Sequence, residues 1–211
     1  MHRYIATGSA PDREGFFRQG AEEADALLAF CGIEPSTEKT MLEIGCGVGR
    51  MTRRFSERYG SVVAVDVSPE MLARARENLA DRSNVEWVLG SGSDLSPIAD
   101  ATIDHVFSYI TLQHVPRQDA VLSYVRETSR VLRIGGEAGL QVRRPGWQAA
   151  VIDFAGHVGR AARGRPTLAA EWRGTRVPVA SLLDAATVSG SRVELRPRGR
   201  RHLWLVMERV T

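Results

Sequence analysis

Lysine is almost missing from this chain, since Lys39 is the only lysine among its 211 residues. Nearly all of the positive charge therefore comes from arginine, and the net charge is only +3. The densest arginine cluster, residues 196–201, has no aromatic side chain between its charges. Single-stranded nucleic acids are usually bound by basic grooves that also carry aromatic stacking platforms. We therefore expect this cluster to be an exposed turn between two late strands.

Cysteines and long hydrophobic runs are also scarce. The two cysteines, Cys31 and Cys46, are too few for a disulfide framework or a cysteine metal site. No run approaches the roughly 18 apolar residues of a membrane span, and the first residues lack the apolar core of a signal peptide. We expect a cytoplasmic protein that does not contact membranes. The 43% hydrophobic content is typical of a globular protein, and the length predicts one domain over residues 1–211.

The most informative stretch is residues 40–50, which read TMLEIGCGVGR. Three apolar residues interrupted only by Glu43 predict a buried strand. The following residues are nearly free of side-chain bulk, and helical spacing of apolar residues resumes at Met51. Glycine lacks a Cβ, so such a strand-to-helix turn lets a ligand approach the backbone closely. The free N–H groups at the start of the helix would face that ligand.

A second apolar strand, residues 62–65, ends at Asp66. A carboxylate about 20 residues after a glycine-rich turn is placed to accept hydrogen bonds from the ribose hydroxyls of a nucleoside. The glycines run G-x-G-x-G, whereas the dinucleotide fingerprint is G-x-G-x-x-G. From these residues alone, the pattern predicts an adenosine-type cofactor on a Rossmann-like sheet.

Four segments in order make the prediction more specific: LEIGCGVGR, VVAVDVSPEMLARAR, IDHVFS and RVLRIGG. They resemble the successive motifs of the class I S-adenosylmethionine (SAM) dependent methyltransferases, over residues 40–142. The resemblance implies that Glu43 lies near the methionine part of SAM and that Asp66 holds the ribose. It also implies that Val67 and Met71 pack on the adenine. The residues expected to contact SAM are Glu43, Gly45, Cys46, Gly47, Gly49, Arg50, Asp66, Val67, Met71, Gly92, Ser93, Asp94, Tyr109 and Gln113.

One position departs from the family pattern. Many members carry an acidic residue just after the glycine that ends the third strand, where it accepts from the adenine amino group. Here that residue is Ser91, and the nearest carboxylate is Asp94. Either Asp94 contacts the adenine in a different register, or backbone atoms of Gly92 and Ser93 do so.

The loop at residues 109–116 follows the predicted fourth strand, at the edge where open α/β sheets bind their ligands. His114 is the only histidine in this loop, and the usual pKa of histidine, near 6.5, suits a general base for a hydroxyl acceptor. The alternative is that His114 only fixes the loop by hydrogen bonding. No metal ion is implied, because Asp94, Asp100 and Asp104 are dispersed.

The remaining elements follow from apolar periodicity and turn residues. Helices are expected at residues 12–30, 68–80, 119–132 and 179–189, and strands at 85–89, 102–108, 138–142, 192–196 and 202–209. The predicted fold class is α/β, with a Rossmann-like, seven-stranded, mostly parallel sheet, helices on both faces and an antiparallel C-terminal hairpin. Residues 1–35 are expected to form an N-terminal helical cap. Residues 143–177, with a helix at 147–162, are expected to form a lid or substrate wall.

Together these patterns predict a SAM-dependent methyltransferase that methylates a hydroxyl, or an amine, of a small-molecule acceptor. An RNA methyltransferase and a non-catalytic SAM-binding regulatory protein are the alternatives. An NAD-dependent oxidoreductase fits less well because of the glycine spacing. We expect a monomer or homodimer, with no nucleic-acid partner.

Overall fold

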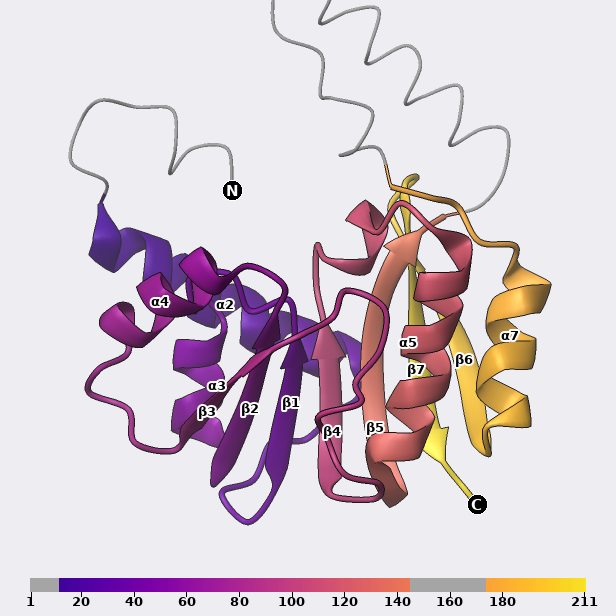
Figure 1. Cartoon of the computed structure of the whole chain (residues 1–211), viewed down its shortest axis with the longest axis horizontal. Coiled ribbons are helices and arrows are strands. Elements are labelled where there is room, and N and C mark those ends of the chain that lie inside the picture. Colours follow the sequence, from indigo (N-terminus) through magenta and orange to yellow (C-terminus); the bar gives the residue numbers. More distant parts are fainter. Residues whose placement is uncertain (1–11, 145–173) are drawn as a thin grey trace, which may run out of the picture.

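The computed structural model describes residues 12–144 and 174–211, and a single seven-stranded sheet runs through this part of the chain (Figure 1). The strand order is β3-β2-β1-β4-β5-β7-β6. The first five strands are parallel, and β7 is antiparallel to both β5 and β6. The strands are β1 (Thr40–Ile44), β2 (Ser61–Asp66), β3 (Val85–Leu89), β4 (Ile103–Ser108), β5 (Leu132–Arg143), β6 (Ser191–Arg198) and β7 (His202–Arg209). The predicted fold class is confirmed.

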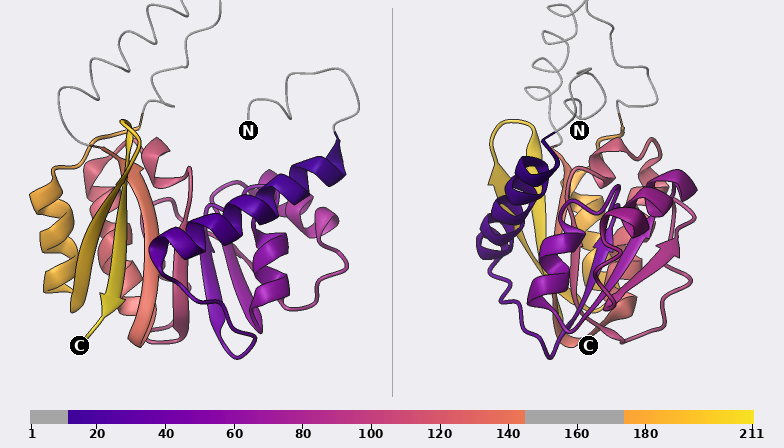
Figure 2. Two further views of the ribbon diagram at one scale, coloured as in Figure 1. Left: turned by 180° about the vertical axis from the view of Figure 1, so that it is seen from behind. Right: turned by 90° about the vertical axis from the view of Figure 1, so that its left-hand side faces the viewer.

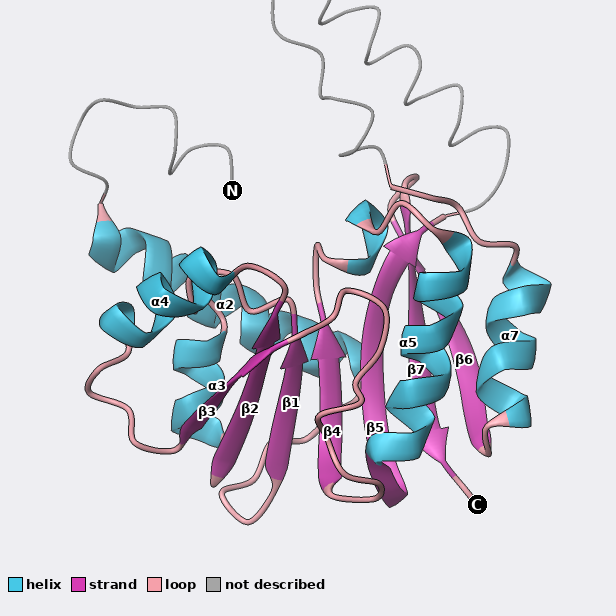
Figure 3. Ribbon diagram, viewed as in Figure 1, coloured by secondary structure: helices cyan, strands magenta, loops and turns pink. Residues whose placement is uncertain are grey.

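Helices cover both faces of the sheet (Figures 2 and 3). The helices are α2 (Arg13–Cys31), α3 (Thr52–Arg58), α4 (Pro69–Asn78), the 3-10 helix η1 (Leu112–His114), α5 (Gln118–Val131) and α7 (Val179–Val188). Alternate residues of each strand face opposite ways. Leu42 and Val106 therefore pack with α5 and α7, whereas Met41 and Phe107 pack with α2 and α3.

Two helix starts form as their sequences predict. The Asp12 carboxylate accepts the N–H of Gly15 at 2.8 Å and caps α2. The Ser68 hydroxyl accepts the N–H of Met71 at 3.2 Å, and Pro69 occupies the first position of α4. Proline suits this position because its missing N–H would have had no partner within the helix.

Two predicted boundaries were wrong. The fifth strand begins at Leu132 instead of residue 138, and its register against β4 shifts between Ile103 and His105, so residues 133–136 form an irregularity inside the strand. Half of the arginine cluster is strand, because Arg196 and Arg198 pair with Trp204 and His202 of β7. Only residues 199–201 form the turn. Pairing with a neighbouring strand sets both boundaries. The local sequence does not indicate which of these residues will pair.

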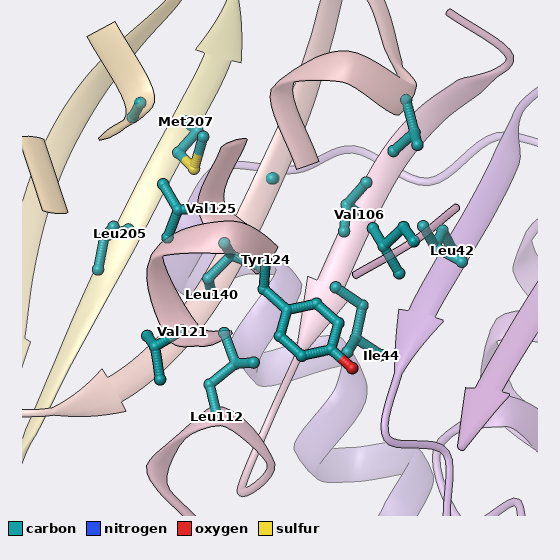
Figure 4. Packing of buried hydrophobic residues seen from close by; sticks show 14 of the residues in the cluster. Leu42, Ile44, Val106, Leu112, Val121, Tyr124, Val125, Leu140, Leu205 and Met207 are labelled. Atoms are coloured by element: carbon teal, nitrogen blue, oxygen red, sulfur yellow. The ribbon is translucent and has the colours of Figure 1, made fainter. Parts of the chain in front are cut away.

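The helix α5 buries more than its predicted apolar residues. Val121 and Val125 face the core as expected, and Tyr124 and Thr128 are buried on the same face. Figure 4 shows the Tyr124 ring among Leu112, Val121 and Ile44. The predicted helix at residues 147–162 lies outside the described residues. Within the described residues, no helix combines the length and apolar character needed to cross a membrane.

Candidate active site

The glycine-rich turn after β1 is tied to the neighbouring strand β2. The backbone N–H groups of Gly45 and Cys46 both donate to the carbonyl of Val65, at 2.7 and 3.0 Å. Gly45, Gly47 and Gly49 all have positive φ, which residues with a Cβ rarely adopt. These bonds hold the turn at the carboxyl ends of β1 and β2, the edge at which open α/β sheets bind ligands.

The Asp66 carboxylate bridges this turn and the loop after β2. One carboxylate oxygen accepts the N–H of Gly47 at 2.8 Å, and the other accepts the N–H of Ser68 at 2.9 Å. A carboxylate oxygen has two lone pairs, so each oxygen keeps acceptor capacity after its backbone bond. Each Asp66 oxygen is therefore held in place by the backbone and can still accept a hydrogen bond from a further donor.

Glu43 is a buried carboxyl group beneath the turn. Its side chain is 5% exposed and accepts the Thr52 hydroxyl at 2.6 Å. Burial raises the pKa of Glu43 to about 7, while the Thr52 hydroxyl and the charge of Arg50 act in the opposite direction. Thr52 is the first residue of α3, so the pair ties the end of β1 to the helix after the turn.

The loop after β4 packs directly on the glycine turn. A Cβ at Gly45 would lie 2.1 Å from the Thr111 hydroxyl oxygen, so only glycine fits there. The neighbouring Ile110 has φ +56°, which is strained for a β-branched residue. Its N–H donates to the Gln141 side chain at 3.0 Å, and this bond helps to hold the strained backbone. Strain of this kind concentrates at binding sites.

The loop after β3 satisfies most of its own polar groups. The Ser91 hydroxyl accepts the N–H groups of Ser93 and Asp94, at 3.2 and 3.1 Å. The Asp94 carboxylate accepts from the Ser96 N–H and the Ser93 hydroxyl. The Ser96 side chain, followed by the Ser96 backbone N–H, contributes most to lowering the pKa of Asp94 to about 2. Asp94 is thus an anion held within its own loop. The choice between Asp94 and the backbone of residues 92 and 93 as adenine contact stays a prediction.

Tyr124 approaches the same loops from helix α5, which the sequence did not suggest. Burial raises the pKa of the Tyr124 phenol to about 12, with further contributions from the charges of Asp94 and Asp66. The Gly92 backbone N–H faces the phenol oxygen and acts in the opposite direction. Sequence spacing placed Val121 and Val125 on the inner face, and Tyr124 lies between them. This position between two inward-facing residues is the sequence signal that could have identified Tyr124.

Three exposed apolar side chains mark this edge of the sheet. Val67 is 58% exposed directly after β2, Leu89 is 55% exposed at the end of β3, and Ile110 is 38% exposed after β4. Apolar surface gathered at a ligand-binding edge is typical of a binding site. Of these three residues, only Val67 was predicted as a contact. Leu89 and Ile110 were missed because the exposure of a strand-end side chain depends on its neighbours.

The remaining candidates are spread around the turn. The Arg50 guanidinium forms an ion pair with Glu23 of α2 at 2.8 Å, and Cys46 is buried in the turn. Met71 is partly buried near the start of α4. The Tyr109 ring stacks on Trp204, with 6.0 Å between ring centroids.

Gln113 and His114 belong to η1. The Gln113 side-chain nitrogen lies 3.0 Å from Nε2 of His114. The Gln113 side-chain oxygen is buried and has no hydrogen-bond partner. This adjacent pair lies on the loop that also carries Thr111 against the glycine turn.

Residues 42–139 match a family model described as a methyltransferase domain. This region contains the glycine turn, Asp66 and η1. Over these residues the chain is similar to methyltransferases.

Among characterised relatives, an arsenite methyltransferase of Halobacterium salinarum is 35% identical over 117 residues, which are 53% of this chain and 28% of that protein. The chain spans 20% to 54% of the length of the first curated relatives that it matches. A putative methyltransferase of Bacillus halodurans has the same fold, with a TM-score of 0.67 and 16% identity over 90% of this chain and all of that one.

Two structural neighbours were solved with S-adenosylhomocysteine. A geranyl diphosphate C-methyltransferase of Streptomyces coelicolor, solved with S-adenosylhomocysteine, aligns over 99% of this chain and 87% of that one, with a TM-score of 0.65 and 14% identity. The glycine-rich turn, the Asp66 acceptors and the exposed Val67 are compatible with such a nucleoside. Within residues 12–144 and 174–211, no group of three or more His, Cys, Asp or Glu side chains could hold a metal ion.

Proposed function

We propose that this protein transfers the methyl group of SAM to a hydroxyl, or an amine, of a small-molecule acceptor. One observation carries the proposal: the loop that holds Gln113 and His114 packs through Thr111 on the glycine turn. SAM lying over that turn would therefore present its reactive end beside the polar pair of η1. Asp66 and Val67 would hold the nucleoside, and Glu43 would lie near the methionine part.

The reaction is an in-line displacement at the methyl carbon. The bond between sulfur and methyl breaks as the acceptor oxygen or nitrogen forms its new bond, and the products are the methylated acceptor, S-adenosylhomocysteine and a proton. Holding the acceptor at near-attack distance alone contributes several kcal/mol, about 7 to 11 in favourable cases. For a hydroxyl acceptor, we assign His114 as the base that receives the proton. An amine can release its proton to water.

The two ends of the 143–177 segment support its role as an acceptor wall. The strand β5 ends at Arg143, and the chain re-enters the described part at Gly174, beside Gln113. On the other side, α2 crosses the end of the glycine turn so closely that a Cβ at Gly20 would lie 2.6 Å from the Arg50 carbonyl oxygen. This contact supports the proposal that the N-terminal region caps the SAM site.

The arginine cluster favours a metabolite acceptor over RNA. Arg196 donates to the Phe30 carbonyl at 2.6 Å and pairs with Glu194, and the Arg198 guanidinium lies over the Phe30 ring at 5.3 Å. These two arginines thus serve the packing of β6 against the end of α2. An RNA methyltransferase would instead show nucleic-acid binding that weakens steeply with salt.

The first test is calorimetric titration with SAM and, in parallel, with NAD. We expect binding of SAM, and preference for NAD would contradict the proposal.

The second test transfers labelled methyl groups from SAM to a panel of hydroxyl and amine acceptors. We expect His114→Gln to reduce turnover of a hydroxyl acceptor about 100-fold or more, the typical contribution of a general base. SAM binding without transfer to any acceptor would favour a regulatory protein.

A further inference from the structure

The backbone at Gly174 packs so closely on η1 that a residue with a Cβ would clash with it. Gly174 has φ +56°, and a Cβ built on it would lie 1.9 Å from the Gln113 carbonyl oxygen and 3.0 Å from Cα of His114. Only glycine, which lacks a Cβ, can approach η1 this closely.

Two hydrogen bonds extend this contact over the next two residues. The N–H of Thr175 donates to the carbonyl of Val115 at 3.0 Å. The Gln118 side-chain nitrogen donates to the carbonyl of Arg176 at 3.0 Å. Residues 174–176 thus contact η1 itself, the residue directly after it and the start of α5.

The loop itself has few internal bonds with which to hold its shape. Within η1 and its caps, the His114 N–H donates to Thr111 at 2.9 Å and the Val115 N–H to Leu112 at 3.3 Å. Short 3-10 helices have poor hydrogen-bond geometry, and the backbone just before this one is strained at Ile110. The position of Gln113 and His114 therefore depends on contacts from outside the loop.

We propose that Gly174 is a positioning residue for methyl transfer, and that residues 174–176 hold η1 so that Gln113 and His114 face the acceptor. This inference rests on the proposed function, because it takes η1 as the acceptor side of the site. The contacts of residues 174–176 fall on η1, on Val115 and on the start of α5, so we expect their effect on the acceptor and not on the cofactor.

The test compares Gly174→Ala with Gly199→Ala in the full chain. Gly199 has φ +68°, and a Cβ there meets nothing within 4 Å, so this control adds similar backbone strain without a clash. We expect Gly174→Ala to bind S-adenosylhomocysteine within about twofold of the wild type, and its peptide 109–118 to exchange amide hydrogens about tenfold faster. Turnover on an acceptor found in the panel should fall about tenfold or more, because a displacement of roughly 1 Å can cost about 100-fold. Gly199→Ala should change none of these.

A second variant keeps the test decisive if Gly174→Ala does not fold. Gln118→Ala removes the bond to Arg176 without adding bulk, and we expect smaller changes in the same direction. Unchanged exchange in peptide 109–118, or an equal loss of S-adenosylhomocysteine affinity and turnover, would overturn the inference. The exchange measurement requires no methyl transfer, so it can succeed or fail separately from the proposed activity.

Discussion

At the scale of single residues, the surroundings decide what each carboxyl group does. Burial raises the pKa of Glu43 to about 7, whereas donors in its own loop lower the pKa of Asp94 to about 2. Asp66 accepts two backbone N–H groups and keeps further acceptor capacity. These three carboxyl groups near one edge of the sheet thus differ in their pKa or in the hydrogen bonds that they can still accept.

Replacing Asp66 with alanine should weaken cofactor binding. The variant loses both oxygens that we propose accept from the ribose, and it loses the bridge between Gly47 and Ser68. Hydrogen bonds to charged groups contribute about 1.5 to 3 kcal/mol, so we expect S-adenosylhomocysteine affinity to fall about 10- to 100-fold in calorimetry. Asp81→Ala, on the exposed turn after α4, is the control. Wild-type affinity in folded Asp66→Ala protein would remove Asp66 from the site.

Two neighbouring buried hydroxyl groups in α5 should respond to removal with opposite signs. The Thr128 hydroxyl is buried without a hydrogen-bond partner, whereas the Ser129 hydroxyl pairs with Ser191 at 2.8 Å. We expect Thr128→Val to raise the free energy of unfolding by about 1 kcal/mol and Ser129→Ala to lower it by about 1 to 2 kcal/mol. Urea denaturation measures both. Changes of the same sign would contradict this assignment of partners.

At the scale of elements, the site is a meeting of loops that follow parallel strands. The turn after β1 is bonded to β2 at Val65, and the loop after β4 packs on it through Thr111. Loops far apart in sequence meet because parallel strands place their carboxyl ends at one edge, the upper edge in Figure 1. A substitution in one of these two loops should therefore also change the conformation of the other loop.

Gly45→Ala tests this dependence. The new Cβ would lie 2.1 Å from the Thr111 hydroxyl oxygen, and the backbone has φ +83°. Gly135, with φ +78° and nothing within 4 Å of a Cβ, provides a control for backbone strain alone. We expect Gly135→Ala to cost about 1 to 2 kcal/mol in unfolding free energy. Gly45→Ala should cost more and should also weaken S-adenosylhomocysteine binding. Equal costs, with binding intact in both variants, would show that the two loops are independent.

At the scale of the whole molecule, the two ends of the sheet carry different chemistry. The carboxyl ends hold the candidate site, whereas a buried polar cluster around His105 of β4 lies toward the other end. Nε2 of His105 is 3.1 Å from the Lys39 ammonium nitrogen, and Nδ1 is 2.9 Å from the Tyr59 hydroxyl. Because an ammonium group can only donate, Nε2 accepts and Nδ1 carries the proton. Burial and the charge of Lys39 lower the pKa of His105 to about 4.

This cluster predicts acid sensitivity of the fold. The unfolded chain binds a proton on His105 at higher pH than the folded protein does, so stability is complete above about pH 6.5 and falls as the pH drops toward 4. We expect the unfolding free energy to lose about 2 kcal/mol between pH 7.5 and 5 from this group. Urea denaturation at several pH values measures this loss. In His105→Gln the unfolding free energy should depend less on pH over this range, whatever the absolute stability of the variant. The same slope in the variant would assign the sensitivity to other groups.

Sequence alone determined the features that depend on near neighbours. The glycine turn, the Ser68 cap, the strand burial and the carboxylate at Asp66 each follow from residues a few positions apart, because helix and strand periods and cap chemistry are local. The order of these motifs was enough for the fold class and for the similarity to methyltransferases. The expected SAM contacts could be proposed in the same way.

Only the tertiary structure decided the features that join distant segments. Thr111 against Gly45, Tyr124 beside the loops after β2 and β3, and Gly174 on Gln113 each join residues 30 or more positions apart. The irregular start of β5 depends on its register with β4. The buried His105 depends on Lys39, directly before β1, and on Tyr59, directly after α3. Such contacts are set by how the sheet and helices pack, and packing brings together residues whose separation in sequence has no fixed period.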